Sequence, residues 1–505
     1  MPERSLHTIG VVGAGTMGRG IVQLFAQAGH RLRCFDSAEG AATKAVDFVA
    51  TMIGRGVDKG RLTAEEFDRI RGRMHACTTM GDLADCNVIV EAIVEDLAVK
   101  QQLYRALEEI VAPTAILASN TSSLTVAEIA SACAHPERVA GLHFFNPVPL
   151  MKVAEVIAAV RTSPATVATL RGLVHGAGHR AVIAADQPGF LVNHAGRGLY
   201  TEGLRIVEER VAEPADVDTV LREAADFRMG PFELLDLTGL DVSSKVMASI
   251  YEQFQHEPRF RPSSLVAPRV AAGLFGRKSG AGWYGYEGDK KIVSERRPAP
   301  ALPDSLKVWV DPKAAHRARL VELVRAAGAL SAEDHRDEAL LIVQPWGSDT
   351  TSYAIEQGLD ASRCVALDPL PGFDRHRTLM LSMSTTASMR DAAHALLASD
   401  GTAVTVINDS PGFIVQRVLA TIVNIAANIA QRGIASIEDI EDAVKLGLGY
   451  PIGPLTWGDR IGGDKVLTIL RNMQTGTGDP RYRPSAWLVR REGLRMSLLT
   501  PEAKR

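Results

Sequence analysis

Apolar and polar positions near the start of the chain follow the order strand, turn, helix, strand. Residues 8–36 read TIGVVGAGTMGRGIVQLFAQAGHRLRCFD: a short apolar run, a glycine turn, apolar residues at helical spacing, and a second strand-like run that ends at Asp36. Similar apolar runs at 88–90, 115–117 and 139–142 are separated by helical stretches. Strands that alternate with helices predict a parallel, doubly wound α/β sheet.

The pattern changes after about residue 187, where long helical segments begin with PGFLVNHAGRGLYTEGLRIVEER. A stretch rich in proline and charge at 287–303 is typical of a linker. Strand-like runs then return at 306–310, 339–343, 364–367 and 404–407, before a second helical region. We therefore expect two α/β domains, at 1–187 and 304–405, and two all-α domains, at 188–287 and 406–505.

Two sequence blocks of the first helical region recur in the second. PGFLVN at Pro188 is repeated as PGFIVQ at Pro411, and MGPFELLDLTGLD from Met229 is repeated as IGPLTWGDRIGGD from Ile452. Both pairs are separated by 223 residues, so the match runs without net insertion. A constant separation predicts an internal duplication of the helical domain, which follows a degenerate copy of the first sheet.

The glycines of the first turn match the Gly-x-Gly-x-x-Gly pattern of a dinucleotide-binding Rossmann domain. The pattern follows a predicted strand and opens a helix, so a pyrophosphate can approach the helix N-terminus. Asp36, at the end of the second strand, can accept hydrogen bonds from both ribose hydroxyls and would repel a 2′-phosphate. We expect NAD as the cofactor, bound by Gly13, Gly15, Thr16, Met17, Gly18 and Asp36.

Two arginines keep an alternative cofactor open. Arg31 and Arg33 lie close enough in sequence to Asp36 to hold the extra phosphate of NADP. Both alternate with apolar residues along the predicted strand, however, which favours side chains that face solvent. NAD remains the preferred prediction.

A histidine and a carboxylate flank a proline-bounded turn in GLHFFNPVPLMKVAE at 141–155. Oxidation of an alcohol needs a base near neutral pH, and a carboxylate on the other ring nitrogen would fix the histidine tautomer. The turn could bring Glu155 back beside His143. From the spacing alone, a buried histidine with a purely structural role is an equally open interpretation.

Composition narrows the classes of function. The 505 residues suggest three or four domains, and a net charge of -3 with a pI near 6.5 gives no basic field for nucleic acid or membrane. The five cysteines are scattered without metal-ligand spacing, so we expect no metal and reduced thiols. We expect no leader before the first predicted strand, and a cytoplasmic protein.

Four motifs together resemble the NAD-dependent L-3-hydroxyacyl-CoA dehydrogenase family. They are SNTSSL at 119–124, GLHFFNPVPLMKVAEV from 141, DQPGFLVN at 186–193 and MGPFELLDLTGLD from 229. The resemblance covers about residues 5–287 in the family's order and spacing. It implies an acyl-CoA substrate, with His143 as general base and Glu155 as its orienting partner.

The same resemblance implies further contacts. Ser122 and Asn193 would hold the 3-oxygen of the substrate and its surroundings. Without the family, Glu95 and Lys100 would be interpreted as a charge pair on a helix face, and Lys59 and Arg61 as solvated charges. With it, the expected contacts are Glu95, Lys100, Asn146 and Lys278 to the cofactor, and Lys59 and Arg61 to the CoA phosphates.

The second half departs from the short family members. Asp368 stands where His143 is expected, Thr378 lies opposite Glu155, and Gln416 replaces Asn193. We therefore expect no second active site. The second helical copy could supply within one chain the pairing of helical domains by which short members dimerise, so a monomer with an internal pseudo-dimer and a homodimer both stay open.

The length, the degenerate second sheet and the second helical domain resemble long bacterial members of the family that serve phenylacetate degradation. The motifs GLGYPIGPLTWGDRIGG from Gly447 and DPLPGFDRHRTLM from Asp368 carry this resemblance. This narrower resemblance implies a substrate that ends in a carboxylate, such as 3-hydroxyadipyl-CoA, with Arg197 as a hypothetical partner for it; 3-hydroxybutyryl-CoA is the alternative. Two other classes of protein fit the motifs less well. A non-catalytic NAD-binding protein would not need His143, Glu155, Ser122 and Asn193 together, and a hydroxyacid dehydrogenase of the 6-phosphogluconate type uses a lysine base.

Overall fold

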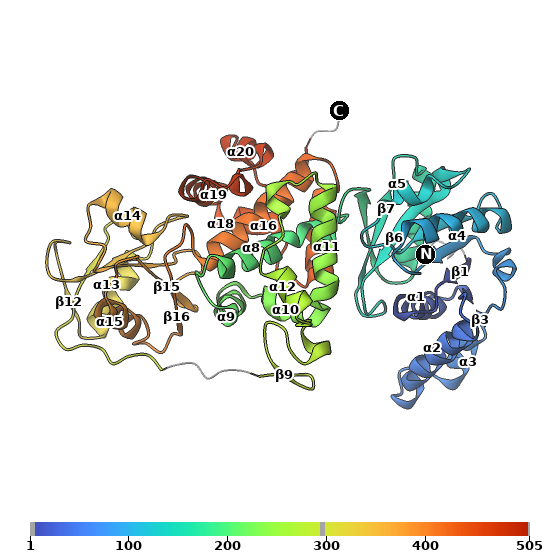
Figure 1. The fold of residues 1–505 in the computed structure, drawn as a ribbon, viewed down its shortest axis with the longest axis horizontal. Coiled ribbons are helices and arrows are strands. Elements are labelled where there is room, and N and C mark those ends of the chain that lie inside the picture. The colour runs from blue at the N-terminus through green and yellow to red at the C-terminus, as the bar shows by residue number, and fades with distance from the viewer. Residues whose placement is uncertain (1–5, 293–297, 503–505) are drawn as a thin grey trace. The chain divides into compact units, whose positions relative to one another are not determined.

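The structure is a computed structural model that describes residues 6–292 and 298–502. The predicted linker at 287–303 falls partly on 293–297, and that part lies outside the described residues. The chain forms two compact units, and Figure 1 labels many of their elements. Unit 1 contains the residues up to His194 together with Arg432–Leu448, and unit 2 contains Ala195–Gln431 together with the residues from Gly449 onward.

Unit 1 is built on an eight-stranded sheet in the order β3-β2-β1-β4-β5-β6-β7-β8. All neighbouring strands are parallel except β6 and β7. The predicted doubly wound sheet is confirmed, although β3, β7 and β8 were not predicted. The strands are β1 (Thr8–Val12), β2 (Arg31–Phe35), β3 (Met74–Ala76), β4 (Val88–Glu91), β5 (Ile116–Ser119), β6 (Val139–Phe144), β7 (Val153–Ala158) and β8 (Arg180–Ala185).

The antiparallel pairing of β6 and β7 follows from their short connection. Residues 145–152 join the two strands, and this segment is too short for the crossover that a parallel pair needs. The chain therefore turns back directly at the Pro-rich segment after Phe144. This reversal brings β7 alongside β6 and is the feature that positions the candidate site.

Helices cover both faces of this sheet because alternate strand residues point to opposite sides. Ile9 and Val11 of β1 pack in one apolar cluster with α1, α2 and α6, whereas Val12 packs in a second cluster with α4 and α5. The helices of unit 1 are α1 (Thr16–Gln27), α2 (Ala41–Asp58), α3 (Ala64–Arg71), α4 (Leu97–Ile110), α5 (Val126–Ala130), α6 (Pro164–Gly176), α7 (Val192–Ala195, whose last residue belongs to unit 2) and α17 (Ile437–Leu448), with short 3-10 turns η1 (Met80–Leu83) and η2 (Pro136–Arg138).

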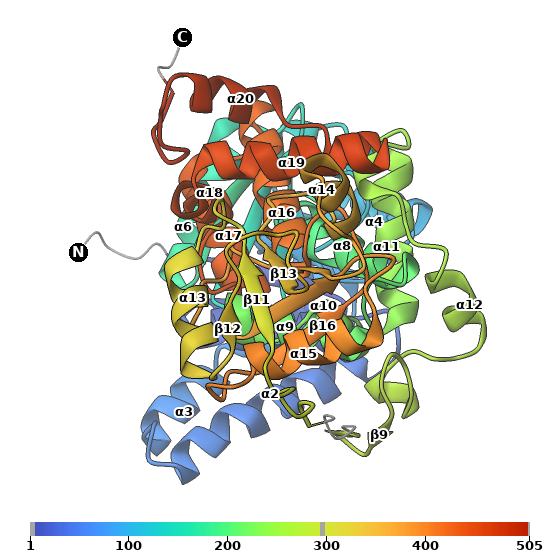
Figure 2. The ribbon, with the colours of Figure 1, turned by 90° about the vertical axis from the view of Figure 1, so that its left-hand side faces the viewer.

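Unit 2 contains a second, six-stranded sheet in the order β12-β11-β13-β14-β15-β16, with only β14 and β15 antiparallel. Figure 2 shows α13 and α15 beside this sheet, and apolar side chains of both helices belong to its core cluster. The four strands predicted here are confirmed, and β12 and β15 are additional. The elements are β11 (Lys307–Val310), α13 (Arg317–Ala326), β12 (Leu330–Ser331), β13 (Leu340–Val343), α14 (Thr350–Gln357), β14 (Cys364–Leu367), β15 (Arg377–Leu381), α15 (Ala387–Leu397) and β16 (Val404–Ile407).

The helices of unit 2 surround α16 (Ile414–Gln431), which is long and apolar enough to cross a membrane but is 83% buried, as core helices of soluble proteins are. At Gly198 a Cβ atom would lie 2.8 Å from Ile422, so the glycine lets α8 approach α16 closely. The other elements are α8 (Arg197–Glu208), α9 (Pro214–Ala225), α10 (Pro231–Thr238), α11 (Leu240–Gln253), η3 (Pro258–Phe260), α12 (Val266–Ala271), η4 (Arg277–Ser279), β9 (Tyr286–Glu287), β10 (Lys290–Lys291), α18 (Pro454–Ile461), α19 (Gly463–Thr477), η5 (Pro480–Tyr482) and α20 (Ala486–Gly493).

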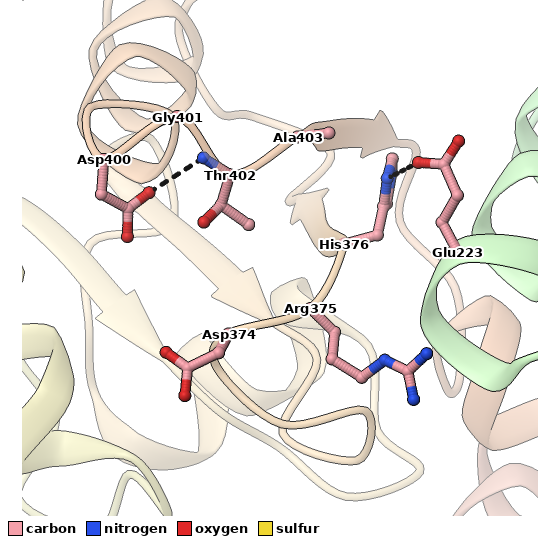
Figure 3. Close-up of a pocket in the computed structure, with 8 residues that line it drawn as sticks. All are labelled: Glu223, Asp374, Arg375, His376, Asp400, Gly401, Thr402 and Ala403. Carbon is pink, nitrogen blue, oxygen red and sulfur yellow. Dashed lines mark hydrogen bonds and ion pairs between the residues drawn. The ribbon is translucent and has the colours of Figure 1, made fainter.

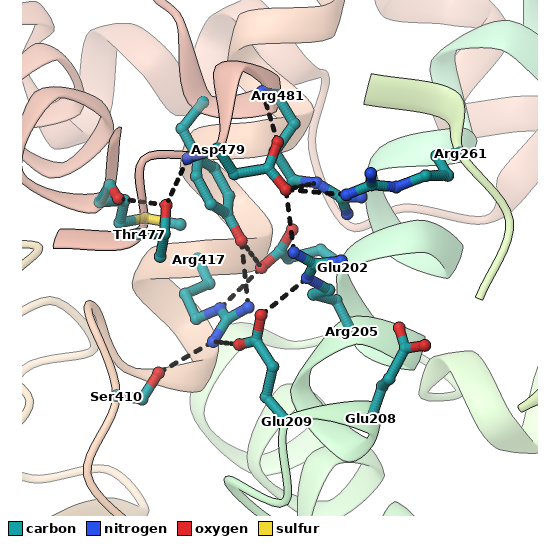
Figure 4. A network of polar contacts seen from close by, with 12 residues as sticks. Glu202, Arg205, Glu208, Glu209, Arg261, Ser410, Arg417, Thr477, Asp479 and Arg481 are labelled. Atoms are coloured by element: carbon teal, nitrogen blue, oxygen red, sulfur yellow. Dashed lines mark hydrogen bonds and ion pairs between the residues drawn. The ribbon is translucent and has the colours of Figure 1, made fainter. Parts of the chain in front are cut away.

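A buried polar network ties α8 to α16 (Figure 4). The guanidinium of Arg417 donates to Glu202 at 2.6 Å, to Glu209 at 2.8 Å, to the Ser410 hydroxyl at 2.9 Å and to the Tyr482 hydroxyl at 3.1 Å. Its side chain is 0% exposed, and that of Glu202 is 1% exposed. A buried charge is tolerated only when it is paired and hydrogen-bonded, and these four partners meet that condition.

The two units repeat one backbone contact. In unit 1 the N–H of Ala185 donates to the carbonyl of Ile434 at 2.8 Å, and in unit 2 the N–H of Asn408 donates to the carbonyl of Val211 at 2.9 Å. Asn408 corresponds to Ala185, and Ile434 corresponds to Val211, each at the separation of 223 residues. The sheet of each copy therefore bonds to the helical region of the other copy. The helical segment that follows Ile434 thus belongs to the sheet unit of the other copy.

Candidate active site

His143 and Glu155 are direct cross-strand neighbours. His143 lies on β6 and pairs in register with Glu155 on the antiparallel β7, so both side chains project from the same face of the sheet. The Nδ1–H of His143 donates to Oε2 of Glu155 at 2.5 Å, since an ionised carboxylate can only accept. Both residues are buried. With Nδ1 engaged, Nε2 is the ring nitrogen that can exchange a proton.

The second oxygen of Glu155 is held by the backbone at the start of α7. Oε1 accepts the N–H of Leu191 at 2.9 Å and the N–H of Val192 at 2.8 Å. Three donors therefore satisfy a carboxylate that would otherwise be costly to bury. The carboxylate is fixed in position, and through it the orientation of the imidazole.

The loop that carries Ser122 is organised by one carboxylate. Oε1 of Glu95 accepts the hydroxyl of Thr121 at 2.7 Å, the N–H of Ser122 at 2.9 Å and the N–H of Ser123 at 3.0 Å. Although burial raises it, the pKa of Glu95 lies below its usual value because Lys100 and these donors favour the ionised form. In this structure Glu95 therefore shapes the loop after β5.

Lys100 is more deeply embedded than a helix-face charge. Its Nζ lies 2.6 Å from Glu91 and 3.4 Å from Glu95, and its side chain is 1% exposed. Glu91, at the end of β4, also accepts the hydroxyl of Ser119 at 2.7 Å. Sequence reasoning missed Glu91, although a carboxylate at the carboxyl end of a central parallel strand marks the edge where such sheets bind ligands.

A second missed residue is Asn120. Its side-chain oxygen accepts the N–H of Phe144 at 2.8 Å. Phe144 is the residue directly after His143. This bond ties the loop of Ser122 to the end of β6. The motif SNTSSL thus contributes an amide that links two strands as well as the serine that the resemblance singled out.

The glycine turn has the shape that a dinucleotide requires. A Cβ atom at Gly13 would lie 2.4 Å from the Ala92 carbonyl oxygen, and one at Gly18 would lie 1.8 Å from the Gly13 carbonyl oxygen, whereas one at Gly15 would meet nothing within 4 Å. Gly15 also caps α1 without a side-chain hydrogen bond, which leaves the first N–H groups of the helix for a phosphate. The absence of a side chain at Gly13 and Gly18 thus allows close backbone packing within the turn. At Gly15 it leaves space for a phosphate to approach the helix N-terminus.

Asp36 lies at the edge of this turn. Its carboxylate accepts the N–H of Ala14 at 2.7 Å and the N–H of Ala38 at 2.9 Å, so it is anchored where β2 ends. Arg33 pairs with Asp85 at 2.9 Å, and Arg31 is exposed. The residues present therefore fit NAD.

The remaining predicted residues lie in different surroundings. Asn193 follows Val192 in α7, and Asn146 is exposed two residues after the end of β6 at Phe144. Lys59 and Arg61 are exposed at and just beyond the C-terminus of α2. The last two predicted residues belong to unit 2: Lys278 pairs with Asp241 at 2.5 Å, and Arg197 is buried with its guanidinium 4.9 Å from the Tyr200 ring centre.

The counterpart of the pair in unit 2 has lost its chemistry. Asp368 and Thr378 are backbone partners across β14 and β15, in the same register as His143 and Glu155. Burial raises the pKa of Asp368 to about 7. In the part of the chain that the structure describes, its Oδ2 has no hydrogen-bond partner, and neither has the Thr378 hydroxyl.

Comparisons with known proteins agree with this geometry. The family described as 3-hydroxyacyl-CoA dehydrogenase, NAD binding domain, matches residues 8–187. The family described as 3-hydroxyacyl-CoA dehydrogenase, C-terminal domain, matches twice, at 189–286 and 412–492. The two matches fall on the two predicted helical copies.

Relatives cover the chain either fully or over its first half. It is 35% identical over 487 residues to 3-hydroxyadipyl-CoA dehydrogenase of Escherichia coli, which covers 96% of this chain and 98% of that protein. It is 38% identical over 277 residues to a probable 3-hydroxybutyryl-CoA dehydrogenase of Deinococcus radiodurans, covering 55% of this chain and 99% of that protein.

Among solved structures, a 3-hydroxybutyryl-CoA dehydrogenase from E. coli superposes with a TM-score of 0.84 at 34% identity, covering 97% of this chain and 99% of that one. The match thus extends over both sheets and both helical copies. The chain therefore belongs to the 3-hydroxyacyl-CoA dehydrogenase family and is an NAD-dependent oxidoreductase of 3-hydroxyacyl-CoA.

Proposed function

We propose that His143 is the base that removes the proton from the 3-hydroxyl group of the substrate, and that Glu155 orients it. The buried contact of 2.5 Å between the two side chains carries this proposal. His143 accepts the hydroxyl proton at Nε2, while Glu155 holds Nδ1–H and stabilises the imidazolium that forms. Bound NAD would supply the acceptor for the hydride that leaves C3.

Ser122 and Asn193 complete the polar surroundings of the 3-oxygen. Support for Ser122 comes from the Glu95 carboxylate that fixes its loop, and support for Asn193 comes from its place directly after Val192, whose N–H bonds to Glu155. A hydroxyl and an amide held on ordered backbone can hydrogen-bond an oxygen whose charge changes during the reaction.

The glycine turn would hold the cofactor, with the carboxylate of Asp36 available to its ribose. The open side of Gly15 supports this placement. Further contacts are assigned by the family resemblance: Thr16 and Met17 at the start of α1, Glu95, Lys100, Asn146 and Lys278 toward the nicotinamide, and Lys59 and Arg61 toward the CoA phosphates.

The acyl group is proposed to be 3-hydroxyadipyl, in phenylacetate degradation. The similarity to the E. coli 3-hydroxyadipyl-CoA dehydrogenase over nearly the whole of both chains supports it. A distal carboxylate needs a cationic partner when it is desolvated, and Arg197 is the candidate because its guanidinium is buried. The alternative is 3-hydroxybutyryl-CoA, which is favoured by the name of the similar E. coli structure.

The protein is further proposed to act in the cytoplasm, without nucleic acid or membrane, as a monomer with an internal pseudo-dimer or as a homodimer. A net charge of -3 and the burial of α16 support the first part. Light scattering of the protein as it elutes from a size-exclusion column measures its mass and so distinguishes a monomer from a homodimer.

Activity is tested by following NADH absorbance with acetoacetyl-CoA. The parent protein should consume NADH, and loss of the signal in His143→Gln should accompany retained NADH binding. A parent protein without turnover on acetoacetyl-CoA or on either 3-hydroxyacyl-CoA contradicts the proposed function.

A further inference from the structure

The helix α17 lies against the catalytic sheet although it comes from the second helical copy. Arg180 of β8 reaches Asp439 at 2.8 Å and Asp442 at 2.9 Å on this helix. The backbone bond from Ala185 to Ile434 fixes the chain just before it. Two ion pairs and one backbone hydrogen bond, all from residues of β8, thus hold α17 in unit 1.

The C-terminal end of α17 reaches the residues that surround Glu155. A Cβ atom built on Gly447 would lie 3.0 Å from both Cγ atoms of Val192 and 3.6 Å from a Cγ atom of Val153. Val192 donates its N–H to Glu155 at 2.8 Å, and Val153 lies two residues before Glu155 on the same face of β7. The missing side chain at 447 therefore sets how closely α17 packs over the carboxylate.

The duplication provides an internal comparison. Residue 447 corresponds to Ala224 of α9 at the separation of 223, and α9 packs on β15 in unit 2, where Thr378 replaces Glu155. At that junction the neighbouring Glu223 reaches His376 at 2.6 Å beside a pocket of about 460 Å³ (Figure 3). His376 corresponds to Val153. The glycine thus occurs in the helix that packs on the strand of Glu155, and alanine in the helix that packs on the strand of Thr378.

We infer that Gly447 is a positioning residue for the reaction: its lack of a side chain lets α17 press Val192 into place, so that the Val192 N–H holds the carboxylate of Glu155 against His143. A side chain at 447 pushes Val192 or α17 away, because a contact of 3.0 Å is closer than a Cβ atom normally makes. The hydrogen bond to Oε1 then lengthens, and the imidazole loses its fixed orientation. The second half of the chain thereby takes part in catalysis without touching the substrate.

The test compares kcat and KM of Gly447→Ala with those of the parent enzyme, using acetoacetyl-CoA and NADH. We expect kcat to fall roughly 5- to 30-fold, the worth of weakening one hydrogen bond to a charged group, with KM nearly unchanged. Gly172→Ala is the matched control: it also replaces a helical glycine in unit 1, but its Cβ atom meets nothing within 4 Å. It should keep the parent kcat.

A rescue separates positioning from general damage. Val192→Ala removes both methyl groups that the new side chain meets but keeps the backbone N–H, so Gly447→Ala in that background should have the kcat of Val192→Ala alone. The double variant also decides the matter if Gly447→Ala does not fold. An unchanged kcat in Gly447→Ala, or a loss that persists in the double variant, overturns the inference. The inference rests on the proposed function, which fails separately if the parent enzyme is inactive.

Discussion

Gln416 donates a hydrogen bond from its side-chain nitrogen to Asp368 at 2.9 Å. These two residues stand where the first half has Asn193 and His143, so the counterparts of amide and base bond to each other in the second half. The oxygen of Gln416 accepts the N–H of Gly347 at 2.7 Å, which draws the loop after β13 onto the same spot. Both polar ends of the Gln416 side chain are therefore engaged by other groups of the chain.

We predict one cofactor site per chain. No Gly-x-Gly-x-x-Gly pattern follows β11, and Asp368 and Thr378 replace the base and its partner. Titration with NADH, followed by fluorescence or calorimetry, should saturate at one molecule per polypeptide. Asp36→Ala should weaken this single binding event, since it removes the carboxylate proposed for the ribose. Two equivalent binding events would show that the second sheet still binds nucleotide.

His143→Gln should lower turnover by roughly 10²- to 10⁴-fold, the usual contribution of a positioned acid–base group. NADH binding should stay nearly as tight as in the parent, because His143 is not a predicted cofactor contact. Steady-state rates and NADH titration measure the two quantities on the same preparation. Equal turnover in variant and parent would remove His143 from the mechanism.

Glu155→Gln should cost nearly as much as His143→Gln, because it removes the charge that holds the Nδ1–H. In a double variant the two losses should not multiply, since the residues act as one unit. The values of kcat for the parent, the two single variants and the double variant test this prediction. Losses that multiply would mean that the two side chains act independently.

Arg197→Met tests the proposed acyl group. If its buried guanidinium binds the distal carboxylate, the parent should prefer 3-hydroxyadipyl-CoA to 3-hydroxybutyryl-CoA, and the variant should lose at least about 10-fold of that preference, as expected for a charge-assisted pair. The values of kcat/KM for both substrates measure it. A parent without preference contradicts the dicarboxylic assignment; a preference that survives contradicts the role of Arg197 alone.

Arg417→Met should destabilise unit 2 strongly, because it leaves Glu202 as a buried charge without its guanidinium. The expected loss is about 3–5 kcal/mol, seen as a lower midpoint of urea unfolding. Adding Glu202→Leu should recover much of it. Arg390→Met, which breaks the exposed pair with Asp391, should change stability by less than about 1 kcal/mol and serves as the control. An Arg417→Met midpoint equal to that of the control would contradict the role of the network.

Asp368 should make the stability of unit 2 depend on pH. Burial raises its pKa to about 7 in the folded protein, whereas an unfolded aspartate titrates near 4. Between these values the folded state binds more protons than the unfolded state, so this group lowers stability as pH rises from about 4 to 7. Asp368→Asn should flatten that part of the curve, measured as unfolding midpoints across the range. An unchanged slope would show that Asp368 is ionised in the folded state.

Local pattern by itself determined the sheet class, the glycine turn and the duplication. Glycine spacing decides a tight turn within six residues, and alternation of strands and helices is visible along the chain. The sequence also showed that the Pro-bounded turn after His143 could bring Glu155 back beside it, whereas the cross-strand register that pairs the two residues is seen only in the structure.

Tertiary structure alone decided the contacts between distant segments. No local pattern indicates that Glu91 pairs with Lys100 or that Asn120 accepts the N–H of Phe144. Nor does one indicate that Gly447 packs against Val192, which is more than two hundred residues away in the chain. β7 and β8 were not predicted either. Which side chains share a buried space depends on how whole elements pack, and packing is set by the sum of many weak contacts between segments that no short stretch of sequence contains.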